Sequence, residues 1–399
     1  MSYNKSFIEA RKIRDLALKL AAVDLIGKEQ LAAIISAFKD PLYVPSVFVR
    51  IGLMIFSFIL VNAGMGIMFV LFSGAFSNES AAGVLLILYS FVAIGFLEYF
   101  IKNKNHFRSG IDDCLLFTGV SFFIGGVILT GSLYDAKSIC LVALPVILAA
   151  TWRYADSLSA ASAFICFYVL TFLVLKDFEF GRTWMPFIFL GISSVLVYFF
   201  SRQLKNDALT FYETCLSVLK ILSLVMLYAS MNYFVVREGN MLLNGLTETE
   251  FVDLSQPANL VQYRYEIPLA WLFIAITMVI PIAYIFFALK WKDRLLLWTG
   301  LGIVVLSVAT FKYRFQIMPV EQTMTWCGLF LVVGTWWVIR YLKSHTNRFT
   351  FAHDPTSSNH DLLNAEALLI SQTLVKSAPE PQQGFGGGSF GGGGAGGSI

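Results

Sequence analysis

Long apolar runs separated by short polar clusters fill most of the chain between Val47 and Leu342. Most of these runs are about 18 to 25 residues long, the length that a helix needs to cross roughly 30 Å of hydrocarbon. Helices are expected there because lipid offers the backbone no hydrogen-bond partner. The pattern therefore predicts an all-α fold, a polytopic transmembrane helical bundle with about ten spans.

The predicted spans are rich in Leu, Ile, Val and Phe and contain few charges. We place them at residues 51–73, 81–101, 114–132, 138–152, 157–175, 184–201, 213–235, 267–289, 295–311 and 323–342. Small residues inside two of the spans are expected to mark close helix packing. These are Gly64, Gly66, Gly119, Gly125 and Gly126.

Two further regions flank the transmembrane domain, which we assign to residues 46–342. Residues 1–45 predict a cytoplasmic helical hairpin whose second helix begins at Lys28 and ends before Pro41. A pair this small buries little core alone, so it is expected to dock on the membrane face or on a protein partner. Residues 343–399 form a cytoplasmic tail. Within it, 359–376 predicts an amphipathic helix, a second candidate for a protein contact, and the glycine-rich 377–399 is expected to be disordered.

The turn of the hairpin carries the sequence LIGKEQL, from Leu25 to Leu31, with a Glu-Gln pair at the start of the second helix. A short hairpin of this kind before many spans resembles a bacterial family of predicted membrane proteins of unknown function. The resemblance implies a membrane array behind the hairpin, and it supplies no catalytic residue. The ending FGGGSFGGGGAGGSI is similar to glycine-rich endings of various bacterial membrane-associated proteins.

Charge placement adds an orientation to this picture. The chain is 57% hydrophobic and 14% charged, whereas soluble proteins carry about a quarter charged residues. With the N-terminus inside, the inner segments hold roughly three times as many Lys and Arg as the outer loops. This bias predicts a multi-pass protein of the cell's inner membrane with both termini cytoplasmic. Residues 1–40 are charged throughout, so we expect no cleavable signal peptide there.

The usual signatures of soluble enzymes and metal sites are absent from the sequence. It contains no GxxxxGK[ST], GxSxG or HExxH motif. The cysteines form no CxxC and are read as small buried residues: Cys114, Cys140, Cys166, Cys215 and Cys327. There is also no basic, aromatic-interleaved soluble domain for nucleic acid. We therefore expect no cofactor, no bound metal and no nucleic-acid partner, with the lipid bilayer as the surroundings.

Two charged residues inside the predicted spans are candidates for function. Glu98 could couple an ion, although a plain pair with Lys102 four residues later also explains it. Lys220 lies about two turns inside its span and could contact a carboxylate, an anionic substrate or a lipid headgroup. The alternative for Lys220 is that its stem extends to the cytoplasmic face. We expect Lys220 to be shielded from lipid, with Asp112, Asp113 and Glu98 as candidate partners.

Polar and proline residues supply further candidates. Asp112 and Asp113 could hold a metal ion, or they could simply favour the start of a helix. Asn62 could line a polar pathway or hydrogen-bond across a helix interface. Pro145 and Pro281 could mark broken helices around a central site, as in secondary transporters, or ordinary kinks.

These features favour a non-enzymatic membrane protein, either a transporter-like permease or a membrane component of a larger complex. The alternative is an intramembrane enzyme acting on lipid-linked substrates, of the glycan polymerase or ligase type. Its candidate residues are Arg237 and Arg264, in a long predicted outer loop at 236–266. That loop holds more acidic than basic residues, which disfavours an anionic lipid-linked sugar phosphate.

Overall fold

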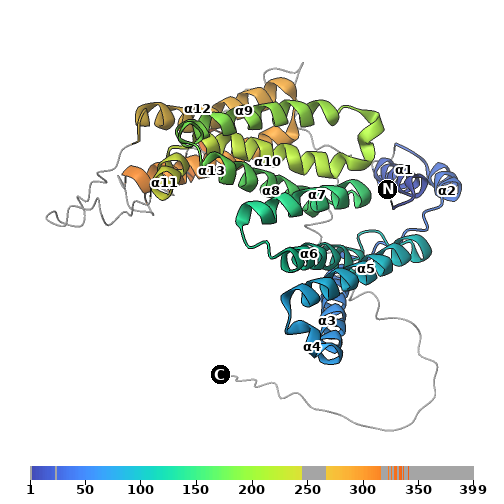
Figure 1. The fold of residues 1–399 in the computed structure, drawn as a ribbon. Helices are drawn as coiled ribbons and strands as arrows, with labels where there is room; N and C mark the ends of the chain where they lie inside the picture. Colours follow the sequence, from blue (N-terminus) through green and yellow to red (C-terminus); the bar gives the residue numbers. More distant parts are fainter. Residues whose placement is uncertain are drawn as a thin grey trace, which may run out of the picture. The chain divides into compact units, whose positions relative to one another are not determined.

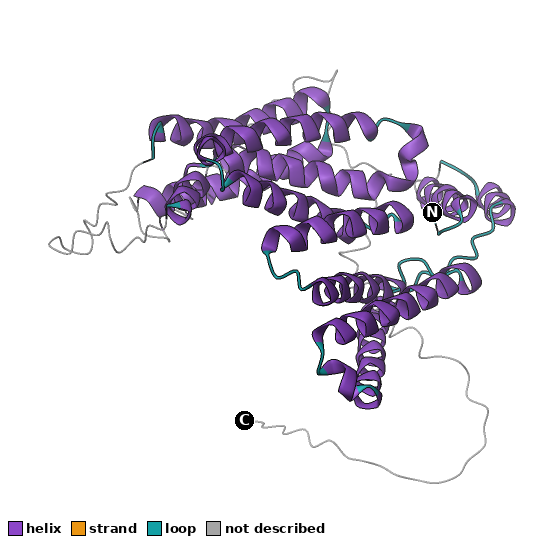
Figure 2. Cartoon of the chain, in the orientation of Figure 1, coloured by secondary structure: helices purple, strands orange, loops and turns teal. Residues whose placement is uncertain are grey.

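The computed structural model describes residues 2–22, 25–244 and 267–315, together with isolated positions between 322 and 340. Figures 1 and 2 show helices joined by short loops and turns in this part of the chain. The chain divides into two compact units: residues 12–38 belong to one, and residues 2–11 and the membrane array belong to the other. The predicted helix at 359–376 and the glycine-rich segment lie outside the described residues.

The two helices before the membrane array are α1 (Lys5–Ala22) and α2 (Lys28–Ala37). A local contact stabilises the start of α2: the Gln30 side chain accepts a hydrogen bond from the Gly27 amide at 3.0 Å. Backbone amides at a helix start have no partner within the helix, so this contact stabilises the first turn. Two helices are thus present where the hairpin was expected, and their pairing as a cytoplasmic hairpin stays a prediction.

Nine helices of the described part are long and apolar enough to cross a membrane. They are α3 (Val47–Leu71), α5 (Glu79–Lys104), α6 (Ile111–Gly131), α7 (Ala136–Tyr154), α8 (Ser157–Leu175), α9 (Glu179–Gln203), α10 (Glu213–Met231), α12 (Ala270–Trp291) and α13 (Arg294–Phe315). The first nine predicted spans correspond to these helices, and the tenth, 323–342, lies mostly outside the described residues. The protein is an all-α polytopic membrane protein.

Consecutive spans pack as antiparallel hairpins, with α5 on α6, α7 on α8, α9 on α10 and α12 on α13. Helix α10 also contacts α8, α12 and α13, and it has the largest buried share of the nine spans. It is thus the central helix of its neighbourhood (Figure 1). Because the spans alternate in direction, the turns at 105–110, 155–156, 204–212 and 292–293 share one side, the near end, where α3 begins.

Side-chain caps explain why the loops between the spans are so short. Asn78, Asp135 and Asp156 stand directly before α5, α7 and α8, and each accepts hydrogen bonds from backbone amides of the first helical turn. Such caps satisfy amides that otherwise have no partner, and each is typically worth about 1 kcal/mol. The chain can therefore start a new span within a few residues of the previous one.

Glycine brings the backbones of α5 and α6 into direct contact. A Cβ added at Gly83 would lie 2.7 Å from the Gly126 carbonyl oxygen, and one added at Gly126 would lie 2.7 Å from the Gly83 oxygen. Gly64 likewise leaves room for the Tyr89 hydroxyl, at 2.7 Å from a built Cβ. The packing prediction is confirmed for Gly64, Gly126 and Gly119, which approaches Ile94. It is wrong for Gly66 and Gly125, where open space surrounds the position.

The end of the seventh span differs from the prediction. Helix α10 ends at Met231, and a separate helix, α11 (Tyr233–Leu243), begins after Asn232. The apolar run continues across this point, so the sequence alone suggested one helix to residue 235 and a loop from 236. Two short elements, α4 (Ser73–Phe76) and the 3-10 helix η1 (Asp207–Tyr212), complete the described fold.

Candidate functional site

Polar side chains gather in two places in the membrane array. The first, which we call the acid cluster, is formed by Glu98, Asp112 and Asp113 at the near end. The second, which we call the polar seam, follows one side of α10 and consists of Lys220, Tyr228 and Asn232 with their partners on α12, α13 and the turn between them. Each sequence candidate can be assigned to one cluster, to neither, or to the undescribed part of the chain.

Asp112 and Asp113 open α6 but turn to different partners. The Oδ2 atom of Asp113 accepts hydrogen bonds from Arg50 of α3, at 3.0 Å from Nε and 2.6 Å from Nη2. Asp112 is 2% exposed, and its Oδ1 accepts from the Ser109 amide at 2.7 Å and the Ser109 hydroxyl at 2.9 Å. Since the two carboxylates serve separate contacts, they do not form a shared metal site in this arrangement.

The turn before α6 is shaped by glycine. Gly110 has a φ angle of +92°, a conformation that side-chain-bearing residues rarely adopt. A Cβ at this position would lie 2.2 Å from the carbonyl oxygen of Arg50. Glycine therefore lets the chain pass close to α3, which brings Arg50 within reach of Asp113.

Glu98 joins three segments of the chain. Its Oε1 accepts from Arg153 Nε at 2.8 Å and from the Tyr154 hydroxyl at 2.9 Å, both at the end of α7. Its Oε2 lies 3.0 Å from Lys102 Nζ, one turn further along α5. The predicted pair with Lys102 is present, but Glu98 is shared among several donors rather than reserved for one.

The segment Ser2–Tyr3, which we call the anchor, also binds the acid cluster. The Ser2 amide donates to the Arg153 carbonyl at 3.1 Å, and the Ser2 hydroxyl donates to Glu98. The Tyr3 hydroxyl donates to Asp112 Oδ2 at 3.2 Å. Burial and the nearby Asp112 carboxylate raise the pKa of Tyr3, so the hydroxyl keeps its proton and remains a donor.

His106 completes the acid cluster through Ser109. Its Nδ1 lies 2.8 Å from the Ser109 hydroxyl, whose own proton is donated to Asp112. The contact therefore requires a proton on Nδ1 of His106. Burial and the charge of Lys104 lower the pKa of His106, although Asp112 opposes them. Ser109 is fully buried and bonded to the carboxylate directly, so the trio lacks the order of a nucleophilic triad.

Lys220 is buried at 5% exposure, and its ammonium pairs with Asp293, in the turn between α12 and α13. The expectation of a shielded Lys220 is confirmed, but Asp112, Asp113 and Glu98 were the wrong partners. Burial opposes ionisation of Asp293, yet hydrogen bonds from Lys220 and the Leu296 amide outweigh it and lower the pKa of Asp293. The carboxylate is therefore ionised at neutral pH.

The next polar groups follow Lys220 at four-residue steps along α10. The Leu224 carbonyl accepts from the Tyr284 hydroxyl of α12 at 3.0 Å. The Tyr228 hydroxyl accepts from the Asn232 amide nitrogen at 2.8 Å. Positions four residues apart lie on the same side of a helix, so these contacts form one continuous line.

Asn232 divides α10 from α11 inside the packed bundle. It is 2% exposed, and its Oδ1 accepts from the amides of Phe234 and Val235, at 3.0 and 3.2 Å. Its Nδ2 also donates to Thr310 Oγ1 of α13, at 3.0 Å. One side chain thus satisfies the start of α11 and ties the helix break to α13, as buried backbone groups require.

Pro281 lies inside α12, which continues past it as one helix. Proline has no amide hydrogen, so the carbonyl of Thr277, four residues earlier, loses its usual helical partner. The Ser307 hydroxyl of α13 donates to that carbonyl at 3.0 Å. The Thr277 hydroxyl in turn accepts from the Tyr233 amide of α11, also at 3.0 Å. The boundary between α10 and α11 and the proline site of α12 therefore meet at Thr277.

The remaining candidates lie outside both clusters. Asn62 is exposed on α3, and its amide donates to the Phe58 carbonyl of the same helix at 2.7 Å, not across an interface. Pro145 lies inside α7 and is exposed. Arg237 is 2% exposed on α11 and its Nη1 lies 2.7 Å from Glu238 Oε1. Arg264 lies outside the described residues.

Sequence reasoning missed Asp293, Asn232, Thr277 and Ser307. Lys220, Tyr228 and Asn232 are spaced by eight and four residues and so lie on one side of the helix, which was the signal that could have located the seam. Among the described residues, no group of three or more His, Cys, Asp or Glu side chains is placed to hold a metal ion. No family model, no curated protein and no solved structure matches the chain, so its resemblance to the hairpin-bearing membrane family stays a prediction.

Proposed function

We propose that the protein is a transporter-like permease whose solute-binding region is the polar seam of α10–α13. The observation that carries this proposal is that the end of α10 at Asn232 and the proline inside α12 meet at one residue, Thr277. A helix end and an internal proline both interrupt the backbone hydrogen bonding of a membrane helix, which is expensive in lipid unless neighbouring side chains satisfy the freed groups. Transporters use such interruptions to offer backbone groups to a solute near the middle of the membrane.

The Lys220–Asp293 pair fits the same role. A buried ion pair costs desolvation free energy, and replacement by apolar residues is often neutral or stabilising. Lys220 would insert more easily as Leu, so its presence needs a reason other than stability. In our proposal, Asp293 releases Lys220 when a cation or proton binds the carboxylate. Binding of that cation or proton is thereby coupled to rearrangement of α10, α12 and α13.

The proposed setting is the inner membrane of a cell, with the near end facing the cytoplasm. The distribution of Lys and Arg in the sequence supports this orientation. Single cysteines at Lys104, at the near end, and Tyr134, in the turn between α6 and α7, would test it. They should react with an impermeant thiol reagent from opposite sides of the membrane, and labelling from the same side would refute the topology.

Membership of a larger complex remains compatible with this proposal. The α1–α2 hairpin and the predicted helix at 359–376 are the segments that we assign to protein contacts. The intramembrane enzyme is less well supported, because Arg237 is almost fully buried and already paired with Glu238. An anionic lipid-linked substrate could reach its guanidinium only after that packing opened.

Accessibility to water distinguishes a transport pathway from a static polar interface. In a background lacking the five native cysteines, we would introduce Ser223→Cys or Ser307→Cys beside the seam. Both serines are buried, at 0% and 4% exposure. A pathway that opens during a transport cycle should allow slow labelling of both by an impermeant maleimide in membrane vesicles.

The matched control is Val305→Cys, on the same helix as Ser307 but 67% exposed. We expect this cysteine to react with a lipophilic maleimide and not with the impermeant one. Absence of labelling at both seam positions, in vesicles where Tyr134→Cys does react, would show that the seam stays closed and would refute the permease.

A further inference from the structure

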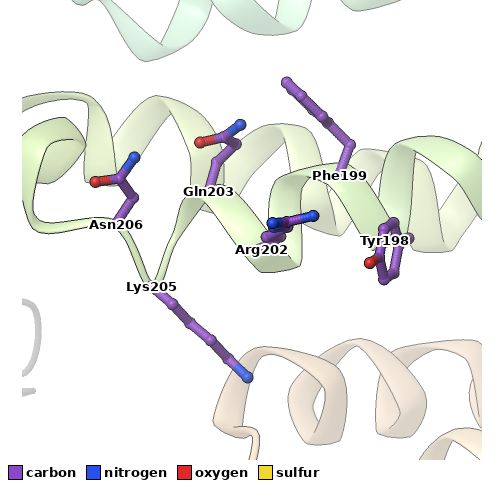
Figure 3. A pocket seen from close by; sticks show the side chains of 6 residues that line it. All are labelled: Tyr198, Phe199, Arg202, Gln203, Lys205 and Asn206. Carbon is purple, nitrogen blue, oxygen red and sulfur yellow. The ribbon is translucent and has the colours of Figure 1, made fainter.

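A basic hollow lies at the near end of α9, separate from both polar clusters. It measures about 590 Å³ and is lined by Tyr198, Phe199, Arg202, Gln203, Lys205 and Asn206. Figure 3 shows these side chains fanned out along the last turns of α9, with Lys205 extending from the turn that follows the helix. The hollow therefore combines two cations, two amides and two aromatic rings.

The two cations have no acidic partner in the part of the chain that the structure describes. Several other near-end cations do, since Arg50, Lys102 and Arg153 each contact a carboxylate. A basic residue at a helix C-terminus is favoured by the helix dipole alone. The hollow itself and the surface leading into it are what distinguish Arg202 and Lys205.

An apolar stripe runs from the hollow along α9 into the membrane. Val195, Tyr198 and Phe199 precede Arg202 by seven, four and three residues, so all four positions share one side of the helix. The three apolar or aromatic side chains are 66%, 68% and 48% exposed. One turn earlier, a side chain added at Gly191 would meet nothing within 4 Å.

We propose that this hollow binds the phosphate group of an anionic phospholipid, with one acyl chain lying along the α9 stripe. Arg202 and Lys205 contact the phosphate oxygens, and the Gln203 and Asn206 amides are placed to contact the headgroup. Arginine suits phosphate because its guanidinium offers several donors in one plane. Basic pockets beside membrane helices on the positively charged side are suited to anionic headgroups. The stripe favours a lipid over a soluble phosphate, which has no acyl chain to place there.

The test uses the full chain in nanodiscs of phosphatidylcholine with a minor share of phosphatidylglycerol. Native mass spectrometry would count the phosphatidylglycerol molecules retained by the parent and by Arg202→Gln/Lys205→Gln. We expect the variant to bind phosphatidylglycerol about tenfold more weakly, since each basic group near an anionic lipid contributes appreciably to binding. Both side chains are exposed, so the variant should fold, and Lys205→Gln alone should give a smaller loss in the same direction.

The matched control is Lys104→Gln/Lys290→Gln, which removes the same charge from the near end at two exposed positions outside the hollow. Retention unchanged in the control and lost in the Arg202/Lys205 variant would support the site. Equal losses in both variants would overturn it, because net charge alone would then explain binding. Full competition by inorganic phosphate, with no preference for the lipid, would also overturn it in favour of a soluble anion.

Discussion

The acid cluster and the polar seam use charge in opposite ways. In the acid cluster the carboxylates are the buried members and their cations reach outward: Arg50 and Arg153 are 41% and 48% exposed. In the seam the cation is the buried member, with Lys220 at 7% side-chain exposure against 25% for Asp293. An exposed arginine that loses its carboxylate is still solvated by water. A buried lysine that loses its carboxylate is not, so breaking the pair costs more.

The comparison also separates two structural roles. The acid cluster ties α3, α5, α6, α7 and the anchor together at one membrane edge, where Glu98 and Asp112 each have donors from more than one residue and Asp113 has the half-exposed Arg50. The seam instead supports a helix boundary at Asn232 and a proline inside α12, and each freed backbone group depends on one side chain. We therefore expect redundancy in the acid cluster and sensitivity to single changes in the seam.

The largest effect is expected for Asp293→Asn, which leaves Lys220 charged, buried and without its carboxylate. Asn keeps the cap on the Leu296 amide, so the change tests the ion pair. We expect a loss of about 3 kcal/mol in the free energy of unfolding, measured by denaturant titration in micelles. Asp113→Asn, whose partner Arg50 is half-exposed, should cost about 1 kcal/mol or less.

A second variant separates the ion pair from other effects of the substitution. Lys220→Met/Asp293→Asn carries no stranded charge and should recover most of the stability lost in Asp293→Asn. If the double variant is as unstable as Asp293→Asn, or if Asp113→Asn costs as much, the contrast between the two clusters is wrong.

The next effect concerns the proline inside α12. Ser307→Ala removes the hydroxyl that satisfies the Thr277 carbonyl, at a cost of about 1–3 kcal/mol. Pro281→Ala restores an amide hydrogen to that carbonyl, so Ser307→Ala should cost much less in the Pro281→Ala background. Ser194→Ala is the control, because Ser194 is exposed and bonds only the Leu190 carbonyl of its own helix among described residues. Equal costs of Ser307→Ala in both backgrounds would contradict the proposed compensation.

A smaller effect is expected at the anchor. Tyr3→Phe keeps the ring against Phe107, at a centroid distance of 5.1 Å, and removes only the hydroxyl bonded to Asp112. Because Ser109 still donates twice to Asp112, we expect a loss of about 1 kcal/mol. Tyr43→Phe, on a 45% exposed ring, should change stability by less. The redundancy that we infer for the acid cluster fails if Tyr3→Phe is as damaging as Asp293→Asn.

The smallest effect is a pH dependence at His106. Its pKa is lowered in the folded protein, chiefly by burial, so the unfolded chain takes up the proton more readily. Stability should therefore be full above the ordinary histidine pKa of about 6.5 and decline as the pH falls toward the lowered value. Thermal unfolding at about pH 7.5 and pH 5.5 would measure this decline, and His106→Gln should reduce it. An identical decline in parent and variant would assign the pH dependence to other groups.

The spans could be predicted from sequence because the length of an apolar run is a local property, and it alone decides whether a helix can cross the membrane. The contacts within the site could not. Lys220 and Asp293 are 73 residues apart, and Asp293 resembles an ordinary charge in a turn. Asn232 was hidden for another reason: the apolar run continues past it, and neither proline nor glycine marks the break. Its cap on the Phe234 and Val235 amides is local, but its contact with Thr310 joins residues that are 78 positions apart.

The two prolines also show that a role set by tertiary contacts cannot be predicted from the local sequence. Pro145 and Pro281 look alike in the sequence, each near the middle of an apolar run. Only Pro281 is buried, with a hydroxyl from the neighbouring helix on the carbonyl it releases. What a proline contributes is decided by the helix that lies beside it, which periodicity does not reveal.

The anchor has a consequence for the order of events during synthesis. Ser2 and Tyr3 are made 96 and 109 residues before Glu98 and Asp112, their hydrogen-bond partners. At roughly 5–20 residues per second, translation separates each pair by about 5 to 20 s. The anchor therefore stays unattached while α3 and α5 enter the membrane and α6 begins to emerge from the ribosome. The anchor can bind only after these helices are in place. A tag fused directly before Ser2 would therefore interfere with assembly more than a tag placed after α2.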